Sequence, residues 1–526
     1  MSAIVTDQFR ILNASNFVAS IEDLSNSYYI FLGLPNPTVY PELETLVGFG
    51  RTTTWNQDPP SPIDNTQYKS HYIDTSLFGK RVTSSNVRRV IRKIDWQKGT
   101  RYEMYRHDYS LQSPSPITKS SRLYDSNYYV VNSDYKVYIC IDNGSSGDNV
   151  FGNLSQNEPA FTDLEPSRAG DTDGYIWKYL FTVSPSDIIK FDSTEYISVP
   201  NEWSTSTNSQ IEAVRTNGNS ELNNNQIKKI YIENSGNGYQ KNLSGYEVDI
   251  LGDGTGGKVQ IDTDSNGKIT KAIVSSGGKN YTYGLVDLGS INSNSLGTPA
   301  KLVPIIPPSK GHGYDIYTEL GADKVLLYAR FDDSTKDFPI DTKFAQVGII
   351  KNPTSIGSTT TYTQSEYSSL YAIKFSESLN VSPIIGEKIY QTVTNGTASG
   401  YVASYDSETY VLKYFRDRSL YYSTTNDETD YVGISTFGSV LEFEASSESI
   451  IGDVSGFSGS IDLGFTGVST IISPGNKVVN LSTYFTQGLS SPEINKSSGD
   501  LIYIDNRTLI SRNSRQKEDI KIILEF

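Results

Sequence analysis

The segment 252–258 is the part of this chain that looks most like a nucleotide-binding loop. Its sequence, GDGTGGK, fits both the GxGxxG pattern of dinucleotide-binding loops and the GxxxxGK pattern of a P-loop. A P-loop also needs Ser or Thr at the next position to hold Mg²⁺, and a helix whose N-terminus faces the phosphates. Val259 stands at that position, and the residues that follow alternate like a strand. We therefore expect a glycine turn between two strands and no bound cofactor.

The segment 262–267 carries an acidic pattern that suggests calcium chemistry. Its sequence, DTDSNG, copies the first half of an EF-hand loop, in which carboxylate oxygens hold the ion. Such a loop also needs a bidentate Glu at its twelfth position and helices on both sides. Ile273 stands at that position, and both flanks are strand-like. Because Asn266-Gly267 strongly favours a hairpin turn, we expect a hairpin, with weak or adventitious cation binding as the alternative.

The three histidines, His71, His107 and His312, are candidates for metal chemistry. Zinc usually takes roughly three or four ligands, so a site would require these distant residues to converge in the fold. His312 lies between two glycines, and we expect a structured turn there that leads into a short helix at 315–320. No His-Glu-x-x-His motif occurs. We therefore expect no metal-binding residue.

Cys140 is the only cysteine, so the fold cannot contain an internal disulfide. It lies in the apolar run 137–141, and we expect a buried, inert thiol. A nucleophilic cysteine would need a histidine nearby in space. The Gly-x-Ser-x-Gly elbow of serine hydrolases does not occur either. The sequence thus predicts no catalytic and no cofactor-binding residue, and a protein that is not an enzyme.

The charge balance limits the classes of partner. The 526 residues include 45 basic and 60 acidic ones, which gives a formal net charge of −15. Phosphate binding needs a basic stripe, and the densest basic run, 88–93, is short, so we expect no nucleic-acid partner. The run is better explained as a solvated or partner-facing strand. We see no signal peptide and no run approaching about 18 apolar residues, so we expect no membrane insertion and folding in a cytoplasm.

Residue usage predicts a β-rich protein with many loops. The chain has 37 Tyr but only 2 Met, and Ser, Asn, Asp and Gly are abundant. Its length predicts roughly two to four domains. Helix signals are few, at 6–24, at 185–191 and in the short segment 315–320. Short apolar or alternating runs bounded by turn residues predict strands at 28–32, 128–131, 175–181 and 519–526.

The Gly- and Asn-rich segment 205–308 is predicted to be an insertion with an internal repeat. Residues 227–239 align with 269–281, and each copy is a strand followed by a glycine turn and a tyrosine. One such unit cannot bury its own apolar face. The repeat therefore predicts a small β module made of duplicated hairpins.

The segment 354–490 is predicted to be a second insertion. Runs at 389–391, 400–405 and 409–415 predict consecutive antiparallel strands, and residues 406–408 supply one turn. A small barrel or sandwich-like module is the expected architecture.

Blocks of sequence outside these two segments share their order with a known protein family. They are 3–10, 29–33, 90–96, 99–102, 135–142, 173–181, 195–200, 344–353, 498–507 and 520–526. In these blocks the chain resembles the baseplate wedge subunit eight family of T4-like contractile-tailed phages. The resemblance extends over 1–203, about 309–353 and about 491–526, and the two segments between depart from it.

The resemblance implies a β-sandwich framework with two inserted small β modules and few short helices. The domains expected on this basis are 1–204, the framework's first part; 205–308, the repeat-containing module; 309–353, the framework continuation; 354–490, the second module; and 491–526, the C-terminal framework strands. It further implies a homodimer in the virion tail baseplate, assembled in the host cytoplasm. There the chain would bridge neighbouring wedge proteins and link the inner baseplate to its periphery, without catalysis.

A glycan-binding or glycan-cleaving tail protein is the alternative function. Tyrosine and tryptophan surfaces with Asp and Asn side chains can bind sugars, and a glycosidase needs two carboxylates roughly 5–10 Å apart. A fibre protein usually shows long repetitive shafts, whereas this chain shows one duplicated unit. We therefore favour the structural role.

Overall fold

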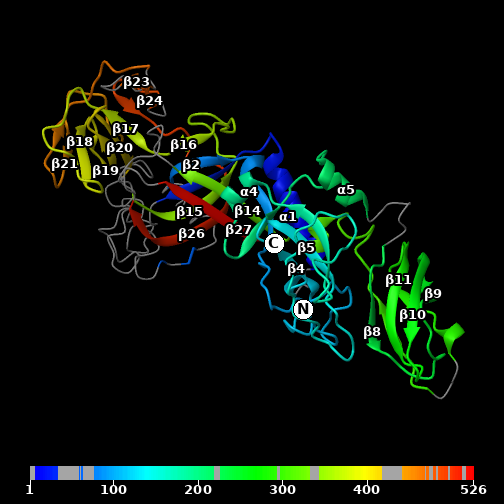
Figure 1. The fold of residues 1–526 in the computed structure, drawn as a ribbon. Coiled ribbons are helices and arrows are strands. Elements are labelled where there is room, and N and C mark those ends of the chain that lie inside the picture. The colour runs from blue at the N-terminus through cyan, green and yellow to red at the C-terminus, as the bar shows by residue number, and fades with distance from the viewer. Residues whose placement is uncertain are drawn as a thin grey trace, which may run out of the picture. The chain divides into compact units, whose positions relative to one another are not determined.

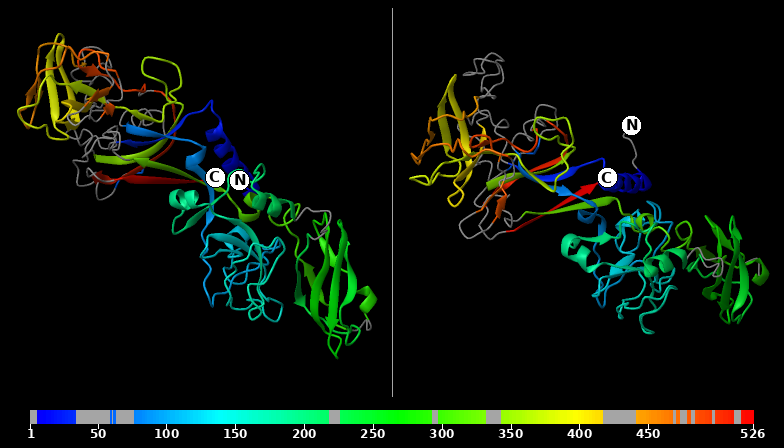
Figure 2. Two further views of the ribbon diagram at one scale, coloured as in Figure 1. Left: turned by 45° about the horizontal axis from the view of Figure 1, so that its top comes forward. Right: turned by 90° about the horizontal axis from the view of Figure 1, so that it is seen from above.

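The computed structural model shows a mostly β protein with several antiparallel sheets (Figures 1 and 2). The described residues are 6–33, 59, 61–62, 76–217, 226–292, 297–331, 343–416, 441–467, 470–472, 478–480, 484–495, 498–511 and 517–526. Within them the chain forms four α-helices. The mostly β fold expected from composition is thus confirmed. Among the described residues, no helix is long and apolar enough to cross a membrane.

The chain forms two compact units. Unit 1 is made of Met1–Val18, Arg88–Leu326 and Ile523–Phe526, and unit 2 of Ala19–Val87 and Leu327–Ile522. Four elements have residues in both units, namely α1 (Asp7–Glu22), β3 (Val87–Arg92), β14 (Lys324–Phe331) and β27 (Glu518–Glu525). The helix expected at 6–24 and the strand expected at 519–526 are confirmed. The five domain ranges given above stay a prediction.

A three-stranded antiparallel sheet, β4-β5-β6, lies in the largest apolar core of unit 1. Trp177 and Phe181 on β6 and Tyr138 on β5 are buried there, as expected for aromatic residues on a pleated surface. The helix predicted at 185–191 is confirmed. Ser184 caps it and a proline occupies its first turn, and both features favour a helix start. The elements are β3 (Val87–Arg92), β4 (Tyr129–Val131), β5 (Lys136–Asp142), β6 (Ile176–Thr182), α4 (Pro185–Phe191), β7 (Tyr196–Val199), α5 (Ser209–Asn217) and α6 (Ile316–Leu320).

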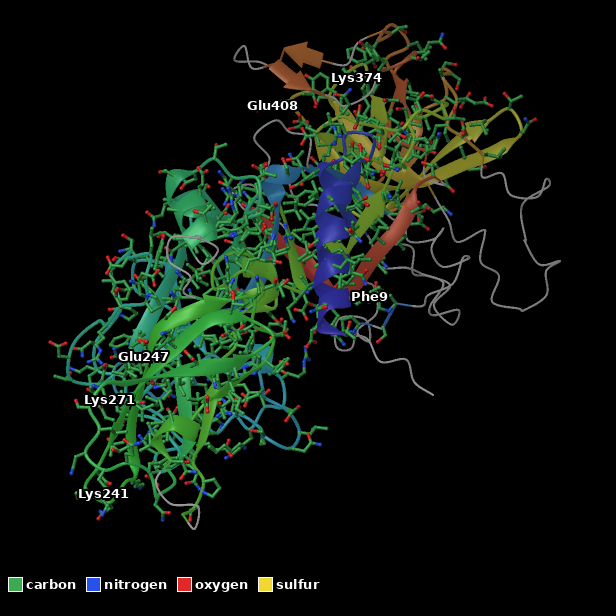
Figure 3. The ribbon with its side chains drawn as sticks, turned by 90° about the vertical axis from the view of Figure 1, so that its right-hand side faces the viewer. Phe9, Lys241, Glu247, Lys271, Lys374 and Glu408 are labelled. Carbon is green, nitrogen blue, oxygen red and sulfur yellow. The ribbon has the colours of Figure 1, made fainter. Side chains whose placement is uncertain are left out.

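The segment 226–306 adds a four-stranded antiparallel sheet of order β11-β10-β9-β12 and a two-stranded sheet, β8-β13. One face of the larger sheet covers a core of its own, which includes Val248, Ile250 and Val259. Figure 3 labels Glu247 and Lys271 on this sheet. The strands are β8 (Ile230–Asn234), β9 (Tyr246–Gly252), β10 (Thr255–Thr263), β11 (Ile269–Lys279), β12 (Gly284–Val286) and β13 (Lys301–Pro304).

The two copies of the repeat place equivalent residues in the same core. Ile227 and Ile269 open the copies and are fully buried, and Tyr239 and Tyr281 end them and are nearly so. Each tyrosine hydroxyl bonds to the main chain: that of Tyr239 accepts from the N–H of Ala300 (2.8 Å), and that of Tyr281 donates to the carbonyl of Ile250 (2.8 Å). The strands of the copies, β8 and β11, pair with β13 and β10, which lie outside the repeat.

Unit 2 contains a five-stranded antiparallel sheet of order β16-β2-β1-β15-β26. Its register sets Ile30 opposite Ile349, and one face covers a core that includes Tyr29, Phe31 and Tyr367. The β1 strand confirms the run expected at 28–32. The strands are β1 (Tyr28–Gly33), β2 (Ser76–Val82), β15 (Lys343–Lys351), β16 (Glu366–Ser368) and β26 (Asp500–Ser511).

A seven-stranded sheet of order β22-β21-β18-β19-β20-β17-β25 follows in unit 2. The three consecutive strands and the turn at 406–408 expected in this segment are confirmed by β18, β19 and β20. The strands of this sheet and of a separate two-stranded one are β17 (Tyr371–Lys374), β18 (Lys388–Val393), β19 (Gly396–Asp406), β20 (Val411–Arg416), β21 (Ile450–Gly452), β22 (Ser458–Gly459), β23 (Thr470–Ile472), β24 (Val478–Asn480) and β25 (Leu489–Ser490).

Replacing Gly348, on β15, with alanine should destabilise unit 2. A methyl group there would overlap the ring of Phe31 and lie 2.8 Å from the carbonyl oxygen of Tyr503, so strands must shift. We expect Gly348→Ala to lower the free energy of unfolding by about 1–3 kcal/mol, as overpacking does. Gly464→Ala is the control, because its nearest neighbour would be 3.4 Å away. Equal calorimetric melting temperatures for the two variants would contradict this packing.

Candidate functional site

The glycine-rich segment 252–258 contains the expected turn, at residues 253–254, between strands β9 and β10. The carboxylate of Asp253 accepts hydrogen bonds from the N–H groups of Thr282 (2.9 Å) and Tyr283 (3.3 Å). It therefore fixes a neighbouring loop. The strand β10, rather than a helix, follows the turn, so this loop lacks the helix N-terminus that binds phosphate.

The hairpin expected at Asn266-Gly267 is confirmed as the turn between β10 and β11. Asp264 accepts from the N–H groups of Asn266 (2.8 Å) and Lys268 (2.9 Å), and Gly267 has a φ of 76°. A positive φ favours glycine, which explains this residue. Within the described ranges, no group of three or more His, Cys, Asp or Glu side chains is placed to hold a metal ion.

His312 lies in a buried polar cluster that sequence reasoning missed. Its Nδ1 lies 2.5 Å from one carboxylate oxygen of Glu319, and the other oxygen accepts from the N–H of Gly313 (2.6 Å). The ring of Tyr105 packs edge-on against the imidazole, with centroids 4.8 Å apart. The turn and the short helix expected here are confirmed, since α6 begins after its N-cap, Asp315. The signal that could have revealed the pair is Glu319, placed in that helix seven residues after the histidine.

His107 is equally structural in its surroundings. Its Nδ1 accepts a hydrogen bond from the N–H of Ile306 (3.1 Å), and burial lowers its pKa. Both facts favour a neutral imidazole. His71 lies outside the described residues.

Cys140 is fully buried on β5, as expected. Burial raises the pKa of its thiol well above the ordinary value, with Asp142 adding to the effect. Because the thiolate is the reactive form, this environment makes the thiol inert.

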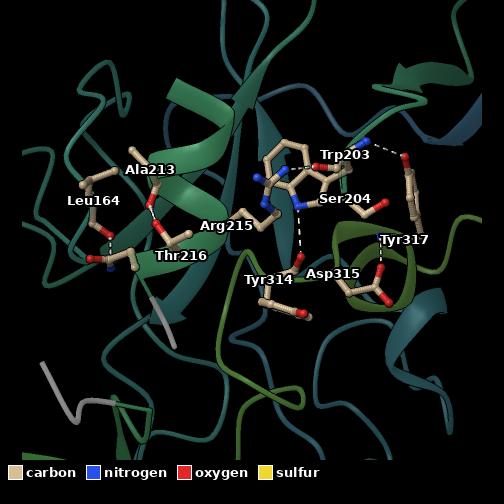
Figure 4. A pocket seen from close by; sticks show the side chains of 10 residues that line it. Leu164, Trp203, Ser204, Ala213, Arg215, Thr216, Tyr314, Asp315 and Tyr317 are labelled. Atoms are coloured by element: carbon tan, nitrogen blue, oxygen red, sulfur yellow. Dashed lines mark hydrogen bonds between the residues drawn. The ribbon is translucent and has the colours of Figure 1, made fainter. Parts of the chain in front are cut away.

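One hollow in unit 1 has a volume of about 790 Å³ (Figure 4). It lies where the chain enters and leaves the segment 205–308, and we call residues 200–204 and 311–317 the first crossing. The lining residues are Leu164, Trp203, Ser204, Ala213, Arg215, Thr216, Asn217, Tyr314, Asp315 and Tyr317.

Trp203 and Tyr317 tie the two sides of the first crossing together. The indole N–H of Trp203 donates to the carbonyls of Gly313 (3.1 Å) and Tyr314 (3.0 Å). The hydroxyl of Tyr317 accepts from the N–H of Trp203 (3.1 Å) and donates to the carbonyl of Pro200 (2.7 Å). The guanidinium of Arg89 lies 3.4 Å from the centre of the Tyr317 ring. The cation–π contact and the hydrogen bonds thus hold residues 200–204 and 311–317 together.

The polar groups of this hollow are engaged with the protein itself. Arg215 donates to the carbonyl of Trp203 (2.5 Å), and Asp315 caps α6 by accepting from the N–H groups of Tyr317 and Thr318. The Trp203 side chain is 1% exposed, so its ring cannot stack on a sugar. These contacts favour a structural joint rather than a ligand site.

Lys178 of unit 1 is a buried lysine with a lowered pKa, a feature that catalytic lysines often share. Burial lowers its pKa to about 8, although Glu319 and Glu165 partly oppose the effect. Its Nζ donates to the carbonyl of Leu164 (2.5 Å), and it is not among the residues that line the hollow. The lysine therefore supports a loop and does not face solvent or a bound molecule.

Unit 2 contains a comparable joint, which we call the second crossing and define as residues 354–358, 366–368 and 491–495. The side chain of Asn495 donates to Thr354 Oγ1 (2.8 Å) and to the carbonyls of Ser355 (2.9 Å) and Ser358 (2.8 Å). The carboxylate of Glu493 accepts from the N–H of Ser368 (2.7 Å). Two side chains just after the segment 354–490 thus bind residues near its start.

The surroundings of the Glu493 carboxyl raise its pKa toward neutral pH. Burial raises its pKa to about 7, and Glu366 also raises it. The bond from Ser368, the charge of Lys413 and the hydroxyl of Tyr362 lower it, but by less. The carboxyl therefore changes its charge near pH 7.

Replacing Tyr317 with phenylalanine should weaken the first crossing. The change leaves the N–H of Trp203 and the carbonyl of Pro200 without their hydroxyl partner, so we expect the free energy of unfolding to fall by about 1–3 kcal/mol. Limited proteolysis near residues 200–217 should also become faster. Tyr314→Phe is the control, because that hydroxyl bonds to the exposed Lys310. Equal stability of the two variants would contradict the role given to Tyr317.

Replacing Glu493 with glutamine should remove a pH dependence of stability. The pKa of the Glu493 carboxyl is about 7 in the folded chain and near 4.5 in the unfolded chain. The stability that the neutral carboxyl contributes is therefore fully present below pH 4.5 and is lost as the pH rises through 7. Glutamine keeps an acceptor for Ser368 without the charge. We expect Glu493→Gln to match the parent chain at pH 4.5 and to be more stable, by at most a few kcal/mol, at pH 8. Chemical denaturation at both pH values measures this, and parallel curves would refute it.

Comparison with known proteins adds a distant relative. No protein-family model matches this sequence. Over 220 residues the chain is 27% identical to the baseplate wedge protein gp8 of Enterobacteria phage T4, which covers 38% of this chain and 60% of that protein. The chain thus matches less than two thirds of that relative's length. The resemblance that the sequence blocks indicated is confirmed at this level, and the chain is distantly similar to a baseplate wedge protein of a phage tail.

Proposed function

We propose that this chain is a non-catalytic structural component of the baseplate wedge of a contractile phage tail. In this role it bridges neighbouring wedge subunits as a homodimer and links the inner baseplate to its periphery. The observation that carries the proposal is the similarity to the T4 wedge protein. The same similarity supports a location in the virion tail.

The chemistry of the described residues supports a structural role. Buried carboxylates bond to main-chain N–H groups: Glu103 to Thr118 (2.8 Å) and Asn127 (2.6 Å), and Glu387 to Ser455 (2.8 Å). A carboxylate that accepts several main-chain hydrogen bonds holds the donating loops in place. A general acid or base would instead have to lie within reach of a substrate.

Association with other wedge proteins is the decisive test. We expect light scattering on the purified chain to give a mass about twice 58.2 kDa, and a larger complex when the other wedge proteins of the same genome are added. The wedge mixture without this chain is the control, and it should lack that complex. A monomer that ignores every wedge protein would refute the proposal. If such a monomer bound or cleaved glycans on an array, the alternative function would replace it.

A further inference from the structure

One face of the β9–β12 pair points away from the core of its module. Val248 and Ile250 on β9 and Val286 on β12 are buried. Because successive side chains of a strand point to opposite faces, the residues between them lie on the outer face. The outer residues are Asp249, Leu251, Asp253, Tyr283, Leu285 and Asp287, and we call them the acidic–apolar face.

Leu251 and Leu285 form one rung of the β9–β12 ladder, and the other four residues flank it. Leu251 lies directly opposite Leu285 in the antiparallel register. On one side, the N–H of Asp287 donates to the carbonyl of Asp249 (2.9 Å), which continues the ladder. On the other, Asp253 accepts from the N–H of Tyr283 (3.3 Å).

The apolar side chains of this face are unusually exposed. Leu251 is 51% exposed, Leu285 64% and Tyr283 63%. Single exposed leucines are ordinary on protein surfaces, but here Leu251 and Leu285 pair across two strands, and Tyr283 directly precedes β12. The face therefore has the apolar centre that protein interfaces bury.

The charges around this centre are acidic. Asp249 and Asp287 lie opposite each other, and like charges in that position destabilise a sheet. The nearest lysine in the register, Lys258, lies opposite Asp249. Its Nζ bonds to Glu247 (2.8 Å), and its charge also interacts with Asp249, whereas Asp287 has no lysine opposite it in this register. A basic group supplied from outside would relieve the repulsion between the two aspartates.

We propose that the acidic–apolar face docks a surface of another virion protein in which Lys or Arg side chains flank apolar ones. The proposal rests on the proposed function, because it names the chemistry of one partner. Charge complementarity selects that partner. A second copy of this chain would bring acidic groups against acidic groups, and nucleic acid would bring phosphates.

The test is surface plasmon resonance between the full chain and each purified virion protein of the same genome, at 50 and 300 mM NaCl. We expect a partner whose dissociation constant rises at least about tenfold with Leu251→Ser plus Leu285→Ser, as for a buried interface centre. Asp249→Asn plus Asp287→Asn should weaken binding at low salt and flatten its salt dependence. Circular dichroism checks that both double variants are folded.

Two controls match these variants. Ile273→Ser removes a 44% exposed apolar side chain of β11 outside the face, and Glu212→Gln plus Glu408→Gln gives the same net charge as the aspartate variant. Loss of affinity no larger than in these controls would overturn the docking face while the wedge proposal stands. Self-association that depends on the face would overturn it in favour of a second copy. A chain that binds no virion protein would overturn both proposals.

Discussion

The hydrogen bonds that Trp203 and Tyr317 make with the main chain are the constraint on which the placement of the segment 205–308 depends. The chain passes this point twice, and the indole and the phenol bond across both passages. Buried polar groups must be paired, so few other arrangements of the two passages would satisfy them. With Cys140 as the only thiol, no covalent link can do the same work. Arg89 adds its charge to the Tyr317 ring and a bond to Ser15 (2.9 Å), which ties the joint to helix α1.

Side-chain hydrogen bonds to the main chain also hold other segments in place. Glu103, Glu319 and Glu387 direct carboxylates at main-chain N–H groups of loops, and Glu493 directs one at the N–H of Ser368, where β16 ends. Bonds to an ionised oxygen are stronger than bonds between neutral groups, and one carboxylate serves several donors. Glu493 is the exception in its energetics, because its surroundings favour the neutral form. In a chain rich in loops, such anchors substitute for disulfides.

Local signals made much of the fold predictable. The turn at Asn266-Gly267, the helix capped by Ser184 and the strands at 28–32 and 400–405 follow from turn chemistry, capping and apolar alternation, which act over a few residues. The joints were not predictable, because they depend on contacts between distant residues. Nothing near Trp203 indicates that its indole reaches Gly313, and nothing near Glu493 indicates Ser368. The acidic–apolar face was missed for the same reason, since Asp249 and Asp287 become neighbours only through strand pairing.

The closeness of the two chain passages at each crossing has a consequence for inheritance. Trp203 bonds to Gly313 and Tyr314, and Asn495 bonds to Thr354, so each intervening segment starts and ends at nearly one point. A stretch of chain with adjacent ends can be exchanged without moving its surroundings, which is why domain insertions are tolerated at such places. The DNA that encodes a stretch of this kind can in principle be exchanged as one unit. Trp203, Gly313, Tyr314 and Asn495 lie outside the exchanged stretches and would stay in place under such exchange.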